Sequence, residues 1–382
     1  MIARAVGLLL ALTLGATTAP PARADARISH IELRGQNGEL TSVSGRVLVE
    51  AQDGGLLVEA RDGTLWSVTT AQLQRRTGTT DEFRPMDSGE LSRQLLDEFG
   101  PGFEVITTRH YVICTNAGRK YAEWCGSLFE RLMDAFLNHW RSRPLRLAEP
   151  SSPLIAIVFA SEQEFSEFAE RDAGSAAAGA KGYYSIRTNR TVLFDLSAAP
   201  GTPPARTPAD INRKVAASPL NVATIVHEAT HQIAFNCGLH TRYADNPLWL
   251  TEGMAMYFET PDLDSRTGWR TVGRPNAARL TQFHDYVRQR RPADSLAQLI
   301  SSDARFTDAA MAADAYAEAW ALSYFLIKTR RKDYVEYLDR LSRKPPLFWD
   351  QPEDRRTEFE AAFGDLAALD RQFLKYLTRV GR

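Results

Sequence analysis

Two histidines four residues apart are the first sign of chemistry in this sequence. They stand in the run His227-Glu228-Ala229-Thr230-His231, within a stretch whose apolar residues recur at helical spacing. Residues four apart project from the same face of a helix, so both imidazoles can reach one zinc ion. Glu228 would then reach a water molecule bound to that ion. The pattern predicts a zinc site, with two core histidines satisfied by hydrogen bonds as the alternative.

A catalytic zinc ion needs a third protein ligand and an open fourth position. The segment 246–253 reads NPLWLTEG, which is typical of a helix start with Asn246 as the cap and Pro247 at the first helical position. Glu252 lies in the first turns of that helix, and a loop over 237–245 would return it to the histidines. The chain offers three other ligands nearby: His240, Asp245 and Glu259. Glu252 is favoured because a rigid element positions a ligand better than a loop does.

These residues resemble a known family in type and spacing. HEATH, followed after twenty intervening residues by the Glu252 of WLTEGMAMYFE, is similar to the gluzincin metallopeptidases, the thermolysin-like or peptidase MA-like clan. The stretch 103–326 resembles exported bacterial proteins of that clan that carry a domain of unknown function. The resemblance implies one zinc ion per chain, bound by His227, His231 and Glu252, with Glu228 as general base and acid.

The same resemblance singles out Tyr316. Gluzincin aminopeptidases carry a Tyr-x-Lys-Gly pattern downstream of the ligand Glu, and its Tyr steadies the oxyanion. Tyr316 stands at a similar interval and opens an apolar helical run, but Glu318 and Ala319 replace the Lys and Gly. Tyr316 is therefore a candidate catalytic residue, with packing in the core as its alternative role.

The aminopeptidases also carry a Gly-Ala-Met-Glu-Asn strand whose Glu holds the free amine of the substrate. The corresponding region here, 182–186, has no acidic residue, which disfavours an aminopeptidase. We expect a hairpin around Thr188-Asn189, with the stretch 191–196 as an edge that could pair with a peptide main chain.

The function favoured by the sequence is zinc-dependent hydrolysis of peptide bonds, of the endopeptidase type, in an extracytoplasmic compartment. The alternatives are a non-catalytic zinc-binding scaffold or interaction module of the cell envelope, and hydrolysis of a non-peptide amide. Glu228 favours an enzyme, because holding zinc would not require it. A peptide or protein is the expected partner. The net charge of -1 gives no electrostatic footprint for nucleic acid, and no pattern indicates an oligomeric state.

The first 24 residues are typical of a signal peptide. Arg4 supplies a positive charge, residues 6–16 form a short apolar run, and Ala22-Arg23-Ala24 offers a cleavage site before Asp25. The apolar run is short for a membrane span, and no other stretch is long enough. We therefore expect an exported, periplasmic or extracellular protein with no stable membrane span after cleavage, an uncleaved anchor being the alternative.

Composition and turn signals predict the domain organisation. The chain has 382 residues, of which 44% are hydrophobic, enough for a sizeable core in two domains. Residues 25–80 read as short strands between Gly-containing turns, which predicts a small all-β, barrel-like module. Polar sequence begins at residue 75, and we place a linker over 81–90. An α+β domain follows over 91–382. The resemblance implies a zincin-like fold for that domain, with a mixed sheet and helices.

Three cysteines fit an exported protein without defining a metal site. Cys114 and Cys125 could form a disulfide, which would leave Cys237 over. Burial as small apolar side chains is the alternative.

Overall fold

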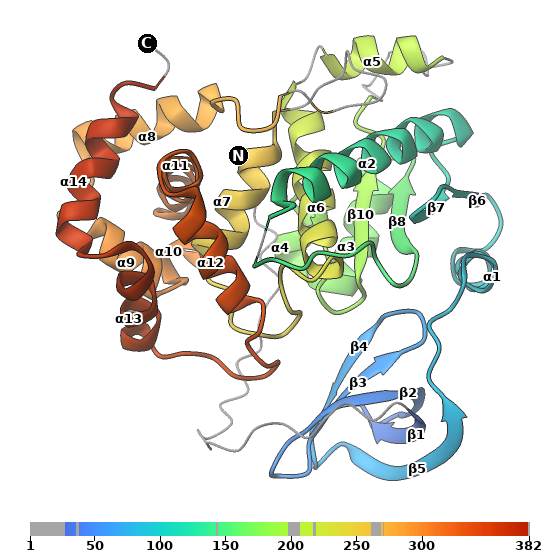
Figure 1. The fold of residues 1–382 in the computed structure, drawn as a ribbon. Helices are drawn as coiled ribbons and strands as arrows, with labels where there is room; N and C mark the ends of the chain where they lie inside the picture. The colour runs from blue at the N-terminus through green and yellow to red at the C-terminus, as the bar shows by residue number, and fades with distance from the viewer. Residues whose placement is uncertain are drawn as a thin grey trace.

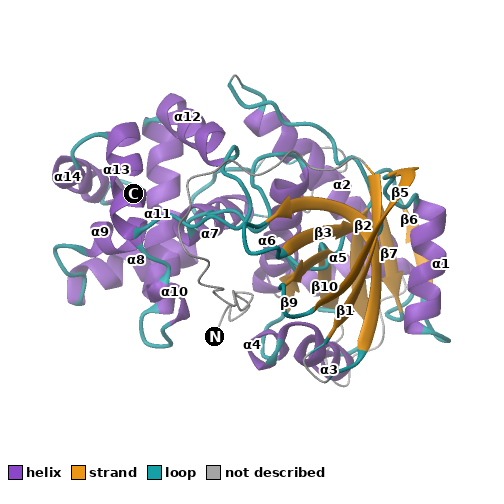
Figure 2. Cartoon of the chain, turned by 90° about the horizontal axis from the view of Figure 1, so that it is seen from below, coloured by secondary structure: helices purple, strands orange, loops and turns teal. Residues whose placement is uncertain are grey.

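The computed structural model describes residues 27–35, 38–142, 144–197, 207–216, 219–260, 269 and 271–380. The predicted signal peptide lies outside these residues. So does Ser218, whose type and position before Pro219 predict the cap of the histidine-bearing helix. The described chain forms two five-stranded sheets and a large set of helices, which confirms the α+β class. Figures 1 and 2 show the C-terminal helices on one side and the sheets on the other, with α6 and α7 between them.

The N-terminal sheet is antiparallel and open. Its strands are β1 (Arg27–Arg34), β2 (Leu40–Glu50), β3 (Leu56–Ala60), β4 (Leu65–Val68) and β5 (Leu73–Glu82). They follow the order β4-β3-β2-β1-β5, so β4 and β5 are the edges within the described residues. The expectation of a barrel-like closure is therefore wrong. The physical reason lies in β5, whose side chains are almost all exposed and bring no apolar face that would close the sheet.

The polar stretch expected to begin a linker at residue 75 belongs to β5, which continues to Glu82 and pairs with β1. An edge strand bonds through its main chain on one side while its side chains meet water, so polar composition does not exclude it. Only residues 83–87 separate this strand from α1 (Ser88–Phe99). The division of the chain into domains stays a prediction.

The N-terminal sheet touches the rest of the molecule. Buried Val49, Leu57 and Leu65 pack against Tyr243 and Leu347, which come from distant loops. The amide of Leu65 also donates a 2.7 Å hydrogen bond to the carbonyl of Arg187. The sheet is therefore in contact with the turn that follows β9 and with the loop that joins α6 to α7.

The second sheet is mixed and more deeply buried. Its strands are β6 (Glu104–Thr107), β7 (Tyr111–Thr115), β8 (Leu154–Phe159), β9 (Gly182–Tyr184) and β10 (Arg190–Phe194). The order is β6-β7-β8-β10-β9, with β7, β8 and β10 parallel and the two outer strands antiparallel. Because β10 lies between β8 and β9, the expectation of an open strand edge over 191–196 is wrong. The short strand β9 forms that edge instead.

Helices cover the second sheet. Those packed on its strands are α1, α2 (Arg119–Trp140), α3 (Glu162–Ala173) and α6 (Pro219–Asn236), whereas α4 (Ser175–Ala178) packs on α3 and α5 (Pro208–Ala216) packs on α2 and α6. Helix α6 packs on β9 and β10, and α2 packs on β6, β7 and α6.

Cys114, Cys125 and Cys237 are buried free thiols, so no disulfide joins the first two. No helix in the described part of the chain is long and apolar enough to cross a membrane.

The C-terminal half is helical. Its elements are α7 (Leu248–Phe258), α8 (Ala277–Gln289), α9 (Ser295–Ser301), α10 (Ala304–Thr307), α11 (Ala312–Thr329), α12 (Arg331–Leu341), α13 (Pro352–Phe363) and α14 (Leu366–Leu377).

Helices α7 and α11 approach closely at Gly253. A Cβ atom there would lie 2.2 Å from Ser323 Oγ and 2.4 Å from the carbonyl oxygen of Ala319. A glycine next to Glu252 thus permits the packing that fixes helix α7.

Candidate metal centre

Helices α6 and α7 supply the metal-binding side chains. His227 and His231 lie one turn apart on α6, and Glu252 lies in the second turn of α7. The start of α7 differs from the expectation, because Pro247 is its N-cap residue and Asn246 does not cap it. The Asn246 side chain donates to carbonyls of the preceding loop. The first amide of the helix donates instead to Asp303, 2.9 Å away and distant in sequence.

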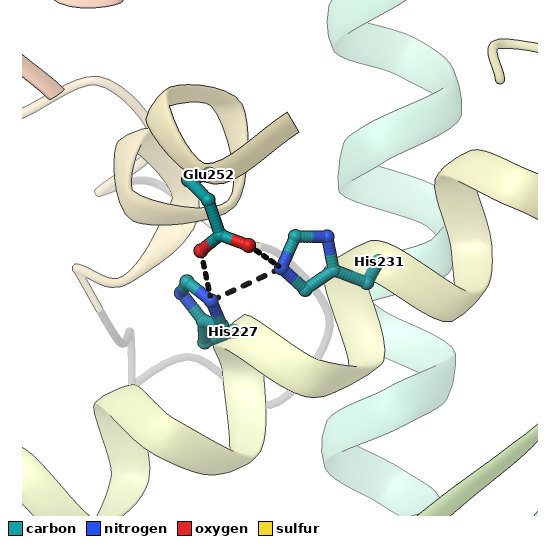
Figure 3. Close-up of side chains that lie close together, drawn as sticks. All are labelled: His227, His231 and Glu252. Carbon is teal, nitrogen blue, oxygen red and sulfur yellow. Dashed lines mark hydrogen bonds and ion pairs between the residues drawn. The ribbon is translucent and has the colours of Figure 1, made fainter. Parts of the chain in front are cut away.

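The three expected ligands converge (Figure 3). His227 Nε2 lies 3.0 Å from His231 Nε2 and 3.1 Å from Glu252 Oε2. His231 Nε2 lies 3.4 Å from Glu252 Oε1. All three side chains are about nine-tenths buried. Helical spacing predicts two neighbouring imidazoles, and the next helix is expected to add a carboxylate. The structure brings these three groups together in one compact cluster.

The donor set fits a zinc ion. Nitrogen and oxygen ligands lie about 2.0–2.2 Å from zinc in a tetrahedron, which places them about 3.3–3.6 Å from one another. The separations of 3.0, 3.1 and 3.4 Å in this cluster lie within a few tenths of an ångström of that range. Two imidazole nitrogens and one carboxylate leave a fourth position open, as in zinc sites that perform catalysis.

Glu259 contacts the cluster from behind and is not one of its ligands. Its Oε1 lies 2.8 Å from His227 Nδ1, and its Oε2 accepts a 2.9 Å hydrogen bond from Asn276. When Nδ1–H of His227 donates to this carboxylate, Nε2 presents a lone pair to the cluster. In the sequence Glu259 stands out only as an alternative ligand. Its spacing of seven residues from Glu252 places both on one face of α7, a signal that could have indicated this supporting role.

The pKa values of His227, Glu252 and Glu259 are shifted by burial and by the neighbouring charges. Burial lowers the pKa of His227, but the carboxylates of Glu252 and Glu259 outweigh burial and hold it well above its usual value. Burial raises the pKa of Glu252, yet His231 and His227 keep it below its usual value. Burial also opposes the ionised form of Glu259, whose pKa is nevertheless lowered by His227 and Arg279. The buried carboxylates therefore stay ionised and attract a cation.

Glu228 lies beside the cluster and faces the edge strand of the second sheet. Its Oε2 accepts a 2.9 Å hydrogen bond from the amide of Tyr184 in β9. Burial raises the pKa of Glu228 above its usual value, although His227 and His231 oppose that shift. A buried carboxylate with a raised pKa accepts a proton more readily than an exposed one does.

Tyr316, in the second turn of α11, is buried close to the same carboxylates. Burial, followed by the negative charges of Glu252 and Glu228, raises its pKa well above the usual value. Its ring packs edge-on against Phe306. Within the described part of the chain its hydroxyl has no hydrogen-bond partner and stays a protonated donor. This environment suits either a donor to a reacting oxygen or a packed core side chain.

The other two alternative ligands lie outside the cluster. Asp245 forms a buried ion pair with Arg355, which ties the loop between α6 and α7 to α13. His240 is buried against Phe235, and its pKa is lowered to about 3 by burial and by His231. Neither residue joins the cluster of donor atoms.

Residues 221–348 match a family described as "Protein of unknown function (DUF1570)". This segment is about a third of the chain. It contains all three clustered residues, Glu228 and Tyr316. No curated protein matches the sequence.

Proposed function

We propose that the protein is a zinc-dependent peptidase of the gluzincin type, an endopeptidase that acts outside the cytoplasm on peptide or protein substrates. The observation that carries the proposal is the buried cluster of His227, His231 and Glu252, with the carboxylate of Glu228 beside it. The presence of Glu228 favours an enzyme over a metal-binding scaffold, because the cluster is complete without it.

Each residue of the site has its own role in the proposed hydrolysis. When bound, zinc would lower the pKa of a coordinated water toward about 7 and polarise the scissile carbonyl. Glu228 accepts the proton of the attacking water and delivers it to the leaving amine. Glu259 holds the Nδ1–H of His227 and so fixes the orientation of that imidazole. The hydroxyl of Tyr316 donates a hydrogen bond to the developing oxyanion.

Strand β9 supports the choice of a peptide as substrate. It is the outer strand of the second sheet on the side of the cluster, and one of its amides already reaches Glu228. A peptide backbone could add to this edge through main-chain hydrogen bonds, which read no particular side chain. Because no acidic residue lies in 182–186 to hold a free amine, an endopeptidase is favoured over an aminopeptidase.

The test is a comparison of the full chain with its Glu228→Gln variant. Both are loaded with zinc, and turnover of a peptide library is measured alongside metal content. We expect equal zinc content and a loss of turnover of about a hundredfold or more, the usual contribution of a general base. Equal turnover in the two proteins would assign the chemistry elsewhere. Zinc binding without turnover in either would favour the scaffold.

A further inference from the structure

Helix α6 presents a stripe of polar side chains to the second sheet. Glu228, Gln232 and Asn236 are spaced four residues apart, so they share one face of the helix. Each bonds to the β9–β10 hairpin, in which β9 pairs with β10 through a turn at residues 185–189. Helix faces that pack on sheets are ordinarily apolar, since a polar group loses its hydration there. The presence of three polar residues, spaced one turn apart on this packed face of α6, therefore requires a specific explanation.

Gln232 anchors the helix to two strands. Its side chain is fully buried, and its Nε2 donates to the carbonyls of Ile155 in β8 and Asn189 in the hairpin turn, at 2.9 and 2.8 Å. Its Oε1 accepts a 2.9 Å hydrogen bond from Thr191 Oγ1 in β10. These bonds have fixed directions, so they determine how far α6 can slide or turn against the sheet. Apolar contacts alone would leave that register less defined.

Asn189 completes the connection on the side of the hairpin. Its backbone is in the left-handed region with φ of 59°, a conformation that asparagine tolerates. Its side-chain amide pairs reciprocally with that of Asn236, at 2.9 and 2.7 Å. The same Oδ1 accepts a 2.8 Å hydrogen bond from the hydroxyl of Tyr184. Asn189 thus joins α6 to the residue whose amide holds Glu228.

We infer that Asn189, Gln232 and Asn236 are positioning residues that fix strand β9 at its place beside Glu228. Among the described residues, their side chains form hydrogen bonds to the sheet, to the hairpin turn, to α6 and to one another, and none to the side chains of the metal ligands or of Glu228. Their effect is to set the distance between the carboxylate of Glu228 and the Tyr184 amide, and hence the orientation of the carboxylate. For turnover the inference rests on the proposed function, but the structural coupling can be measured without it.

The main test uses Asn189→Gly in the zinc-loaded full chain. Glycine keeps the left-handed backbone and removes only the side-chain amide. We expect unchanged zinc content and exchange of amide hydrogens in peptides covering 182–186 that is about tenfold faster or more, because the strand is released locally. Turnover should fall by about ten- to a hundredfold, the scale for a small misplacement of a reacting group.

Two further variants separate positioning from general stability. Gln232→Leu keeps the approximate size and removes the three anchoring bonds, so it should show the same pattern as Asn189→Gly. Leu369→Ala, in α14, should lower the melting temperature while exchange over 182–186 stays at the wild-type rate. Wild-type exchange over 182–186 in both Asn189→Gly and Gln232→Leu would overturn the inference. If the wild type turns over no peptide, the proposed function fails, and the exchange rates still decide the positioning role.

Discussion

The two five-stranded sheets of this molecule bury their residues in different ways. The N-terminal sheet has two small apolar clusters, one of which includes loop residues from the rest of the chain, and a polar, exposed edge strand. In the second sheet β7, β8, β9 and β10 are buried along their whole length, and α6 packs against the last two. Glu228, beside the candidate metal centre, bonds to the edge strand β9 of the second sheet. The more densely packed sheet thus positions the proposed base. The N-terminal sheet meets this region at the hairpin turn and at the loop between α6 and α7.

The largest expected contrast concerns tyrosine hydroxyls. Tyr316→Phe removes the hydroxyl that lies near the charges of Glu252 and Glu228, and we expect turnover to fall by about 10²–10³, the scale for losing one oxyanion donor. Zinc content and melting temperature should stay the same. Tyr243→Phe, against the N-terminal sheet, is the control and should leave turnover unchanged. Full activity in Tyr316→Phe would make Tyr316 a core residue, and a loss of stability without a kinetic defect would indicate a buried hydroxyl with a structural partner.

A pair of glycine substitutions compares the packing of the two regions directly. In Gly253→Ala the new methyl group would lie 2.2 Å from Ser323 Oγ and 2.4 Å from the carbonyl of Ala319, so α7 and α11 must separate. We expect a loss of about 3 kcal/mol in unfolding free energy, together with weaker zinc binding, because Glu252 moves with α7. In Gly78→Ala, on β5, the added methyl meets no atom within 4 Å, and stability should change little. Denaturant titration of both variants measures the difference, and equal effects would contradict the contrast in packing.

The sequence predicted the local features of this site better than its distant contacts. Helical spacing and the resemblance gave His227, His231 and Glu252, because two of these residues share a helix and the third opens the next one. Glu228 bonds to β9, and His227 bonds to Glu259 at the far end of α7. Contacts of this kind depend on how the elements pack against one another. The supporting role of Glu259 is a separate case, because its spacing of seven residues from Glu252 already indicates a shared face of the helix.

The differences from the expected fold have two origins. Strand β5 has the polar composition of a linker because its side chains are exposed at a sheet edge, and for the same reason it brings no apolar face that would close a barrel. The expectation of an open edge over 191–196 is wrong because strand order depends on pairing between segments far apart in sequence. Asn246 has the residue type of a helix cap, yet a distant carboxylate, Asp303, receives the first amide of α7.

Removal of the N-terminal sheet tests its supporting role. A chain lacking residues 1–82 should stay folded and bind zinc, because every clustered residue lies beyond that point. It should lose about 2–4 kcal/mol of stability, since Tyr243 and Leu347 lose their apolar contacts with the sheet. Thermal unfolding and metal analysis of the shortened chain provide the measurement. An insoluble or zinc-free product would mean that the two regions share one folding core.

The pH dependence of zinc affinity gives the smallest expected effect. In the metal-free protein the neighbouring carboxylates hold the pKa of His227 well above its usual value, so this imidazole carries a proton at neutral pH. Zinc must displace that proton, and its apparent affinity should therefore rise about tenfold per pH unit up to the raised pKa. Competition titrations at pH 6, 7 and 8 measure the slope. An affinity independent of pH over this range would show that His227 is already neutral.

Zinc content tests the central claim most directly. The full chain is loaded with zinc, freed of excess metal and analysed for its elements beside Glu252→Ala and His231→Ala. We predict one zinc ion per wild-type chain and less than about a tenth of an equivalent in either variant, because loss of one of three ligands removes most of the affinity of such a site. Less than half an equivalent in the wild type, or equal zinc in all three proteins, would contradict a metal centre formed by His227, His231 and Glu252.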